Sequence, residues 1–185
     1  MKGKQRECRE CGGNAKIVRK DYLFTESGLS NVLVKNIEVA SCAKCKSESP
    51  RIPDLDDLMR TIAVALIDKP SELAGDEVRF LRKYLGQGSE PFAQMLGIDR
   101  SHLSRVENGA MAISRQTDRL VRTLALVHEP SLIEKLKRLK RYEAILQHLS
   151  AIKPETNPVR VQLDHAENGY TYALKAAAQG QSSDS

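Results

Sequence analysis

The sequence predicts an α+β protein in which a small β-rich N-terminal domain precedes an all-α domain. Short runs within the first fifty residues alternate apolar and polar side chains, which is typical of strands. From residue 54 onward, apolar side chains recur three and four positions apart, which is typical of amphipathic helices. All four cysteines precede this change of pattern. The expected organisation is a cysteine-containing domain (1–53), a connecting helix and linker (54–75), a helical domain (76–150), and a hairpin with a disordered tail (151–185).

Composition limits the classes of protein to which the chain can belong. Hydrophobic residues make up 41% of the 185 residues, which is enough for folded cores, but aromatic residues make up only 4%, so these cores should be small and aliphatic. The formal net charge of +5 favours polyanionic partners. The apolar run 62–67 is far shorter than the roughly 20 residues of a membrane span, and the N-terminus lacks an apolar signal segment. We therefore expect a cytoplasmic protein without a membrane-spanning segment.

Strands are expected in the N-terminal domain over 15–19, 22–24 and 32–39, with a turn around Gly28. So few apolar residues cannot hold a domain on their own core. A bound metal ion would supply the stability that the core lacks, since zinc binding contributes folding free energy on the order of 10 kcal/mol.

The cysteines form two Cys-x-x-Cys pairs separated by thirty residues: Cys8, Cys11, Cys42 and Cys45. Two residues between thiolates let both sulfurs of a turn reach one ion, and two such turns complete a tetrahedral site that suits zinc. The histidines all lie far downstream, so four thiolates would close the site and make one Zn²⁺ per chain structural. Disulfides would need an oxidising compartment. Redox or iron–sulfur chemistry remains an alternative.

Residues 54–67 are expected to form an amphipathic helix that Asp54 caps. Apolar side chains share one face of this helix at positions 55, 58, 59, 62 and 66, and Lys69-Pro70 ends the pattern. We interpret it as a connecting helix packed on the N-terminal domain.

The most informative segment, 89–109, predicts two short helices joined by a tight turn. Gly97 ends the first helix, because glycine enters the left-handed region without steric cost. Asp99 or Ser101 can cap the second helix, in which Leu103 and Val106 point inward. Its outward side chains are polar and basic: Arg100, Ser101, His102 and Arg105. Such a helix suits the DNA major groove. The alternative is a small helical bundle with a solvated polar helix.

The spacing FAxxLG followed by IxxxxLSxxENG resembles the Xre or lambda-repressor-like helix-turn-helix family, over about residues 76–126. The resemblance implies that Ser89 contacts phosphate and that Arg100, Ser101 and Arg105 contact base edges. It also implies a backbone or minor-groove contact for Arg115. From its outward position, we expect a weaker base or phosphate contact from His102.

One long helix is expected over 131–150, with a seam of leucines that serves either as core or as a dimer contact. We interpret its cationic side as a solvated face, with phosphate attraction as the alternative. This side comprises Lys135, Lys137, Arg138, Lys140 and Arg141. Further on, the Asn168-Gly169 turn signal between 159–163 and 170–174 predicts a hairpin.

An N-terminal CxxC…CxxC module followed by an Xre-type domain resembles MqsA-type proteins, whose module is called a YgiT-type zinc finger. The resemblance implies a zinc-stabilised N-terminal domain, a dimeric DNA-binding domain and, in some members, a toxin bound by the N-terminal domain. We therefore expect a sequence-specific transcriptional regulator that binds double-stranded DNA as a homodimer on an inverted repeat. The alternative is an antitoxin that covers a small toxin protein and autoregulates its operon. The sequence contains no HExxH, P-loop or Gly-rich dinucleotide turn, so we do not expect an enzyme.

Overall fold

The computed structural model describes residues 5–149 and 159–176, which form a six-stranded sheet and seven α-helices. The α+β class is confirmed, but the order of elements differs from the prediction, because strands also follow the helices. In chain order the elements are β1 (Gln5–Glu7), β2 (Asn14–Leu23), the 3-10 helix η1 (Thr25–Ser27), β3 (Val32–Cys42), β4 (Glu48–Arg51), α1 (Leu55–Asp68), α2 (Gly75–Tyr84), α3 (Ser89–Met95), α4 (Arg100–Glu107), α5 (Arg115–His128), α6 (Pro130–Arg138), α7 (Tyr142–His148), β5 (Val159–Ala166) and β6 (Gly169–Ala176).

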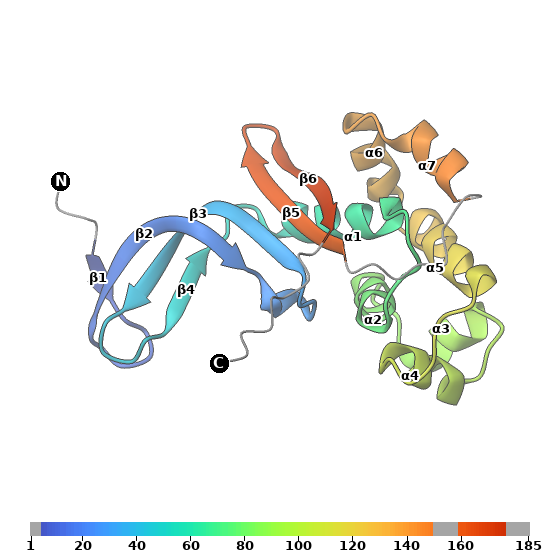
Figure 1. Cartoon of the computed structure of the whole chain (residues 1–185), viewed down its shortest axis with the longest axis horizontal. Coiled ribbons are helices and arrows are strands. Elements are labelled where there is room, and N and C mark those ends of the chain that lie inside the picture. The colour runs from blue at the N-terminus through green and yellow to red at the C-terminus, as the bar shows by residue number, and fades with distance from the viewer. Residues whose placement is uncertain (1–4, 150–158, 177–185) are drawn as a thin grey trace, which may run out of the picture.

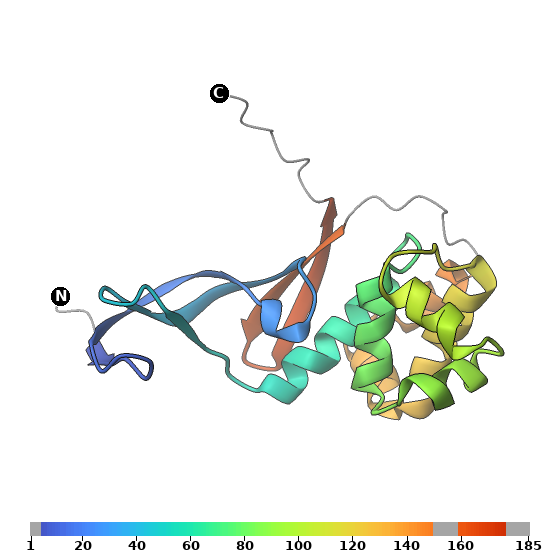
Figure 2. The same ribbon diagram turned by 90° about the horizontal axis from the view of Figure 1, so that it is seen from below.

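The sheet brings together strands from both ends of the described chain. Its order is β1-β2-β3-β5-β6, and β4 pairs with the C-terminal part of β3. β5 runs parallel to the start of β3, with Val32 opposite Val161 and Val34 opposite Leu163. The helices are therefore inserted between strands of one sheet. Figure 1 shows the helices gathered at one end of the sheet, with the β5–β6 hairpin lying between the helices and the strands β1–β4. Figure 2 shows α1 leading from the sheet to the other helices.

The expected C-terminal hairpin is present. β5 and β6 pair antiparallel from Val159 opposite Ala176 to Ala166 opposite Gly169. Gly169 has a φ of +98°, which explains why a glycine follows the turn. The hairpin turn is thus where the Asn-Gly signal indicated, but the pairing of β5 with β3 was not predicted.

Helix α1 lies at the centre of the described part of the molecule. The Asp54 side chain caps it, accepting a hydrogen bond from the N–H of Asp57 at 3.0 Å. Most of its residues from Asp57 onward are buried, against β5, β6, α2, α6 and α7. The Asp57 carboxylate accepts hydrogen bonds from Lys135 at 3.0 and 2.8 Å and from the N–H of Tyr170 at 2.7 Å. One buried carboxylate therefore joins α1, α6 and β6.

The prediction of a single long helix over 131–150 is wrong, because the chain turns between α6 and α7. Lys140 has a φ of +56°, and the N–H of Arg141 donates to the carbonyl of Leu136 at 2.9 Å, which closes α6. The turn places Arg141 against Asp68 of α1, with two hydrogen bonds of 2.9 Å. Lys135 is buried. Three of the five cations assigned to a solvated face thus pair with buried carboxylates of α1, Lys135 and Arg138 with Asp57 and Arg141 with Asp68.

The apolar core is unevenly distributed. One cluster runs from β3 through α1 into the helices and the hairpin. The cysteine end of the sheet has a separate cluster with only four buried residues, which are Cys8, Ala15, Ala40 and Cys42. Apolar burial therefore stabilises this end of the sheet far less than it stabilises the rest of the molecule.

Candidate functional site

The two Cys-x-x-Cys segments form matching turns at one end of the sheet. In each turn the N–H of the first cysteine donates to the carbonyl five residues later, at 2.7 Å in 8–13 and 3.0 Å in 42–47. The N–H four residues after that cysteine donates back to its carbonyl, at 2.9 and 3.0 Å. The residue at that position is left-handed in both turns, Gly12 with φ +66° and Lys46 with φ +62°. Two equivalent turns therefore present two thiols each.

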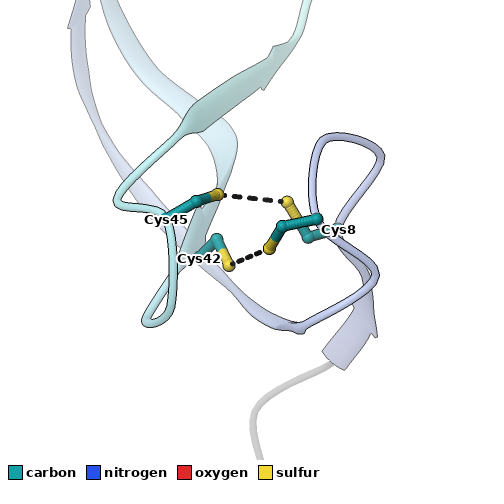
Figure 3. Close-up of side chains that lie close together, drawn as sticks. Cys8, Cys42 and Cys45 are labelled. Carbon is teal, nitrogen blue, oxygen red and sulfur yellow. Dashed lines mark hydrogen bonds between the residues drawn. The ribbon is translucent and has the colours of Figure 1, made fainter.

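All four sulfurs converge on one point, as Figure 3 shows for the labelled cysteines. They lie within 4.8 Å of one another, with Sγ–Sγ distances of 3.7 Å between Cys8 and Cys45 and 3.6 Å between Cys11 and Cys42. Sulfurs bound tetrahedrally at about 2.3 Å from a zinc ion would be roughly 3.8 Å apart. All four cysteines are free rather than disulfide-bonded. The four predicted residues can therefore hold a metal ion.

Hydrogen bonding prepares part of this group for ionisation. The Ser47 hydroxyl lies 3.3 Å from Sγ of Cys8 and 3.1 Å from Sγ of Cys45, and it lowers the pKa of both thiols, that of Cys8 to about 6. The backbone of Gly13 acts to lower the pKa of Cys11, but the sulfur of Cys45 and burial outweigh it and raise this pKa to about 12. Neighbouring thiolates disfavour one another. Four thiolates at this spacing therefore require a cation among them.

The two short helices expected within 89–109 are present as α3 and α4. Gly97 between them has a φ of +67°. The Asp99 side chain caps α4, accepting a hydrogen bond from the N–H of His102 at 2.8 Å. Leu103 and Val106 are buried, as their spacing indicates. The exposed face of α4 is thus fixed by its cap and by two apolar anchors.

Three of the site residues predicted on α4 share its exposed face, namely Arg100, Ser101 and Arg105. The Ser101 hydroxyl lies 2.5 Å from the Asp99 carboxylate, so it already takes part in the helix cap. His102 is half-buried at the edge of this face.

The other two predicted residues begin the neighbouring helices. Ser89 is the first residue of α3 and is half-buried. Arg115 is the first residue of α5; its side chain is 54% exposed and its Nε lies 3.6 Å from the Glu72 carboxylate. Both residues therefore lie outside α4, at the starts of the elements that precede and follow it.

The C-terminal end of α4 is held by contacts that sequence reasoning missed. The buried Glu107 carboxylate accepts two hydrogen bonds from Arg82 of α2, at 2.6 and 2.8 Å. A Cβ on Gly75 would overlap the carbonyl oxygen of Val106, so the backbones of α2 and α4 touch. In the sequence Glu107 is a helix-stop residue. Its position four residues after the buried Leu103 was the available signal that it faces inward.

Comparison with known proteins gave no matching family model, no similar curated protein and no similar solved structure. Across the described part of the chain, none of the helices combines the length and hydrophobicity needed to cross a bilayer. The functional assignment therefore depends on the geometry of the α4 face and of the cysteine group.

Proposed function

We propose that the protein is a sequence-specific transcriptional regulator that binds double-stranded DNA as a homodimer on an inverted repeat. One observation carries the proposal: α4 presents Arg100 and Arg105 to solvent, while its opposite face is anchored in the core. A helix with this division, preceded by a short helix and a tight turn, suits insertion into the major groove. α3 and α4 would then constitute a helix-turn-helix of the Xre type.

The distribution of charge supports a polyanion at this face. Six carboxylates of the helical part are buried and each is paired with a cation, as Asp57–Lys135, Asp68–Arg141, Glu72–Arg115, Glu77–Lys69, Glu107–Arg82 and Asp118–Arg122. These acids therefore contribute little negative potential at the surface. Arg100 and Arg105 form no ion pair within the described residues, and both guanidinium groups are available to a ligand.

In this proposal Arg105 and Arg100 read guanine through paired hydrogen bonds to its O6 and N7 atoms, each worth about 1–3 kcal/mol against a wrong base. Ser89 and Arg115 contact phosphates on either side of α4. Two copies related by a two-fold axis would place their α4 helices about 34–36 Å apart, one helical turn of DNA.

Selection of bound duplexes from random DNA at moderate ionic strength tests this proposal. We expect an inverted repeat, and we expect Arg105→Ala to relax base preference at one position of each half-site. Arg51→Ala, on an exposed residue of β4, is the matched control and should leave the preference unchanged. Equal weakening by Arg105→Ala on the selected and scrambled duplexes would contradict base reading. Absence of preference for any duplex would refute the proposal.

We further propose that the cysteine group holds one structural Zn²⁺ per chain. Four thiolates leave no open coordination position for a substrate or a reactive water, and their tetrahedral spacing suits a single zinc ion. The small local core supports a stabilising role for the metal. Metal analysis of purified protein should give one zinc per chain, and Cys42→Ser should lose it. Iron with visible absorbance would point to an iron–sulfur centre instead.

An MqsA-type antitoxin is the second candidate. It is favoured by the position of the cysteine end of the sheet, which lies at the opposite end of the molecule from α4 in Figure 1. A protein partner could therefore bind there while α4 contacts DNA. The test is co-purification of the full chain with the product of a short neighbouring reading frame. Complex formation should survive Arg105→Ala and be lost on metal removal; the reverse pattern would contradict binding through the cysteine end.

A further inference from the structure

The open edges of the sheet differ in how they are protected against pairing. Beyond β1, the edge of β2 carries Arg19, Lys20 and Asp21 together with a break in register. β4 is only four residues long and contains Pro50. Charges, bulges, prolines and shortness all keep edge strands from pairing with other chains. β6 is eight residues long, pairs with β5 without a break, and carries one charge, Lys175. Among the described strands, β6 is therefore the edge suited to pairing.

At the open edge of β6, only the first outward-pointing backbone N–H group has a hydrogen-bond acceptor within the described residues. The N–H of Tyr170 points away from β5 and donates to Asp57 at 2.7 Å. Because successive amides of an antiparallel strand point alternately to its two sides, the N–H groups of Tyr172 and Leu174 also point away from β5. No described residue accepts a hydrogen bond from either of them outside the sheet. Within the described residues, two backbone donors on this edge are thus open.

A groove of about 500 Å³ lies beside these two donors. β6 contributes residues 171–174 to its lining, and the helices contribute Asp68, Leu139 and Arg141. Leu139 and Leu174 are half-buried and give the groove an apolar part. The described helices therefore leave open space beside this part of the edge.

The solvent-facing side of the hairpin has its charges separated. Lys175 of β6 lies directly opposite Arg160 of β5, and like charges in this position destabilise a strand pair. Both are exposed, and within the described residues neither forms an ion pair with a carboxylate. On the same face, Asp164 lies opposite Thr171 at the other end of the hairpin, and it is exposed too. The hairpin thus has cations at one end and a carboxylate at the other.

We propose that β6 pairs antiparallel with β6 of a second copy of this chain, about a two-fold axis at Ala173. In this register Tyr172 and Leu174 of each copy exchange backbone hydrogen bonds with Leu174 and Tyr172 of the other, which satisfies the open donors. Lys175 falls opposite Thr171 of the second copy, with Asp164 of that copy one strand further. Strands lie about 4.7–4.9 Å apart, so a lysine side chain spans the intervening strand.

The pairing is self-complementary in both charge and size. Asp164 of each copy compensates the Arg160–Lys175 cations of the other, and Ala173 faces Ala173 across the axis. Because the two-fold axis makes the contact isologous, it closes as a dimer and leaves no β6 edge open. The surface is separate from the exposed face of α4, and its test does not involve DNA.

Sedimentation equilibrium of the full-length, metal-loaded chain over a concentration series tests the proposal. Wild type should show a monomer–dimer equilibrium. Ala173→Glu places two carboxylates opposite each other across the axis and should weaken association roughly fivefold or more. Ala173→Lys should weaken it likewise, and an equimolar mixture of the two variants should restore the dimer. Ala112→Glu, in an exposed loop residue after α4, is the matched control and should change nothing.

The register is tested by charge reversal. Lys175→Glu should weaken the dimer, and adding Asp164→Lys to the same chain should restore it. The side chain of Ala173 is exposed, so both of its variants should keep the wild-type circular dichroism spectrum. A chain that stays monomeric across the series would overturn the proposal. A dimer that ignores Ala173→Glu would also overturn it, because it would use another surface.

Discussion

The backbone contact between α2 and α4 decides whether Gly75→Ala raises or lowers the free energy of unfolding. Gly75 begins α2 without a left-handed φ, so alanine suits its conformation. In open space this exchange favours the helix by about 0.5–1 kcal/mol. Here, however, the new Cβ would overlap the carbonyl oxygen of Val106 and lie 3.1 Å from the carbonyl carbon and oxygen of Glu107. Glu107 is held in turn by Arg82, so α4 cannot move without disturbing that ion pair.

The clash should outweigh the gain in helix propensity. Because the overlap is with backbone atoms, the cost lies in the upper part of the overpacking range, about 2–3 kcal/mol. Subtracting a helix gain of up to about 1 kcal/mol leaves a net loss of about 1–2 kcal/mol in the free energy of unfolding. For a chain of this size the melting temperature should fall by about 2–8 °C. The backbone atoms concerned belong to the last turn of α4, so the change should also displace Arg105 and weaken binding to a selected duplex.

Urea and thermal unfolding of the variant and the wild type measure this effect. Gly88→Ala is the control, because Gly88 precedes α3 and its Cβ would meet only the Pro91 side chain, at 3.4 Å and beyond. It should lose less than about 1 kcal/mol, the difference between the two residues at a helix start. If Gly75→Ala proved as stable as wild type or more so, the inferred contact between α2 and α4 would be wrong.

Two further predictions concern the junction of helices and hairpin and the cysteine end of the sheet. Asp57→Ala should lower the free energy of unfolding by about 3–5 kcal/mol in urea, because it leaves Lys135 buried without a partner; an unchanged midpoint would contradict the role of this pair. Burial raises the pKa of Asp57, but hydrogen bonds from Lys135 and from the N–H of Tyr170 outweigh it and hold this pKa below its usual value. The wild type should therefore keep this stabilisation above about pH 4 and lose it as the pH falls further, whereas unfolding curves of Asp57→Ala should lack that component. Chelation of the metal should remove hydrogen-exchange protection from the turns 8–13 and 42–47 while α1 stays protected, because the cores are separate; simultaneous loss at both places would show that the metal supports the whole fold.

Features set by neighbours in the chain could be predicted from the sequence. The caps at Asp54 and Asp99 and the left-handed Gly97 depend on backbone groups a few residues away, and the structure has them where the pattern indicates. The cysteine group was predictable for a similar reason. Each Cys-x-x-Cys spacing fixes two sulfurs in one turn, and the chain offers no other cysteines to complete the set.

Features set by distant partners could not be predicted in this way. The alternation of apolar and polar side chains along 159–163 identifies a strand, but it does not identify β3 as the strand with which β5 pairs. Lys135 and Arg141 have the spacing of a solvated helix face, yet their partners Asp57 and Asp68 lie on α1, beyond the reach of local pairing rules. Lys140 adopts a left-handed backbone conformation and separates α6 from α7, but no glycine or proline near it in the sequence indicates a helix end.

The insertion of the helices between β3 and β5 determines when the molecule can be completed during its synthesis. Val32 leaves the ribosome before α1–α7, but it cannot meet Val161 until all of these helices have been translated. Parallel pairs between such distant segments are slow to form. In the interval α1 lacks the hairpin that covers it, and its apolar surface is open to chaperones or to other nascent chains. A ribosome that stalls after α7 would therefore release a product prone to aggregation, even though all the described helices had already been made.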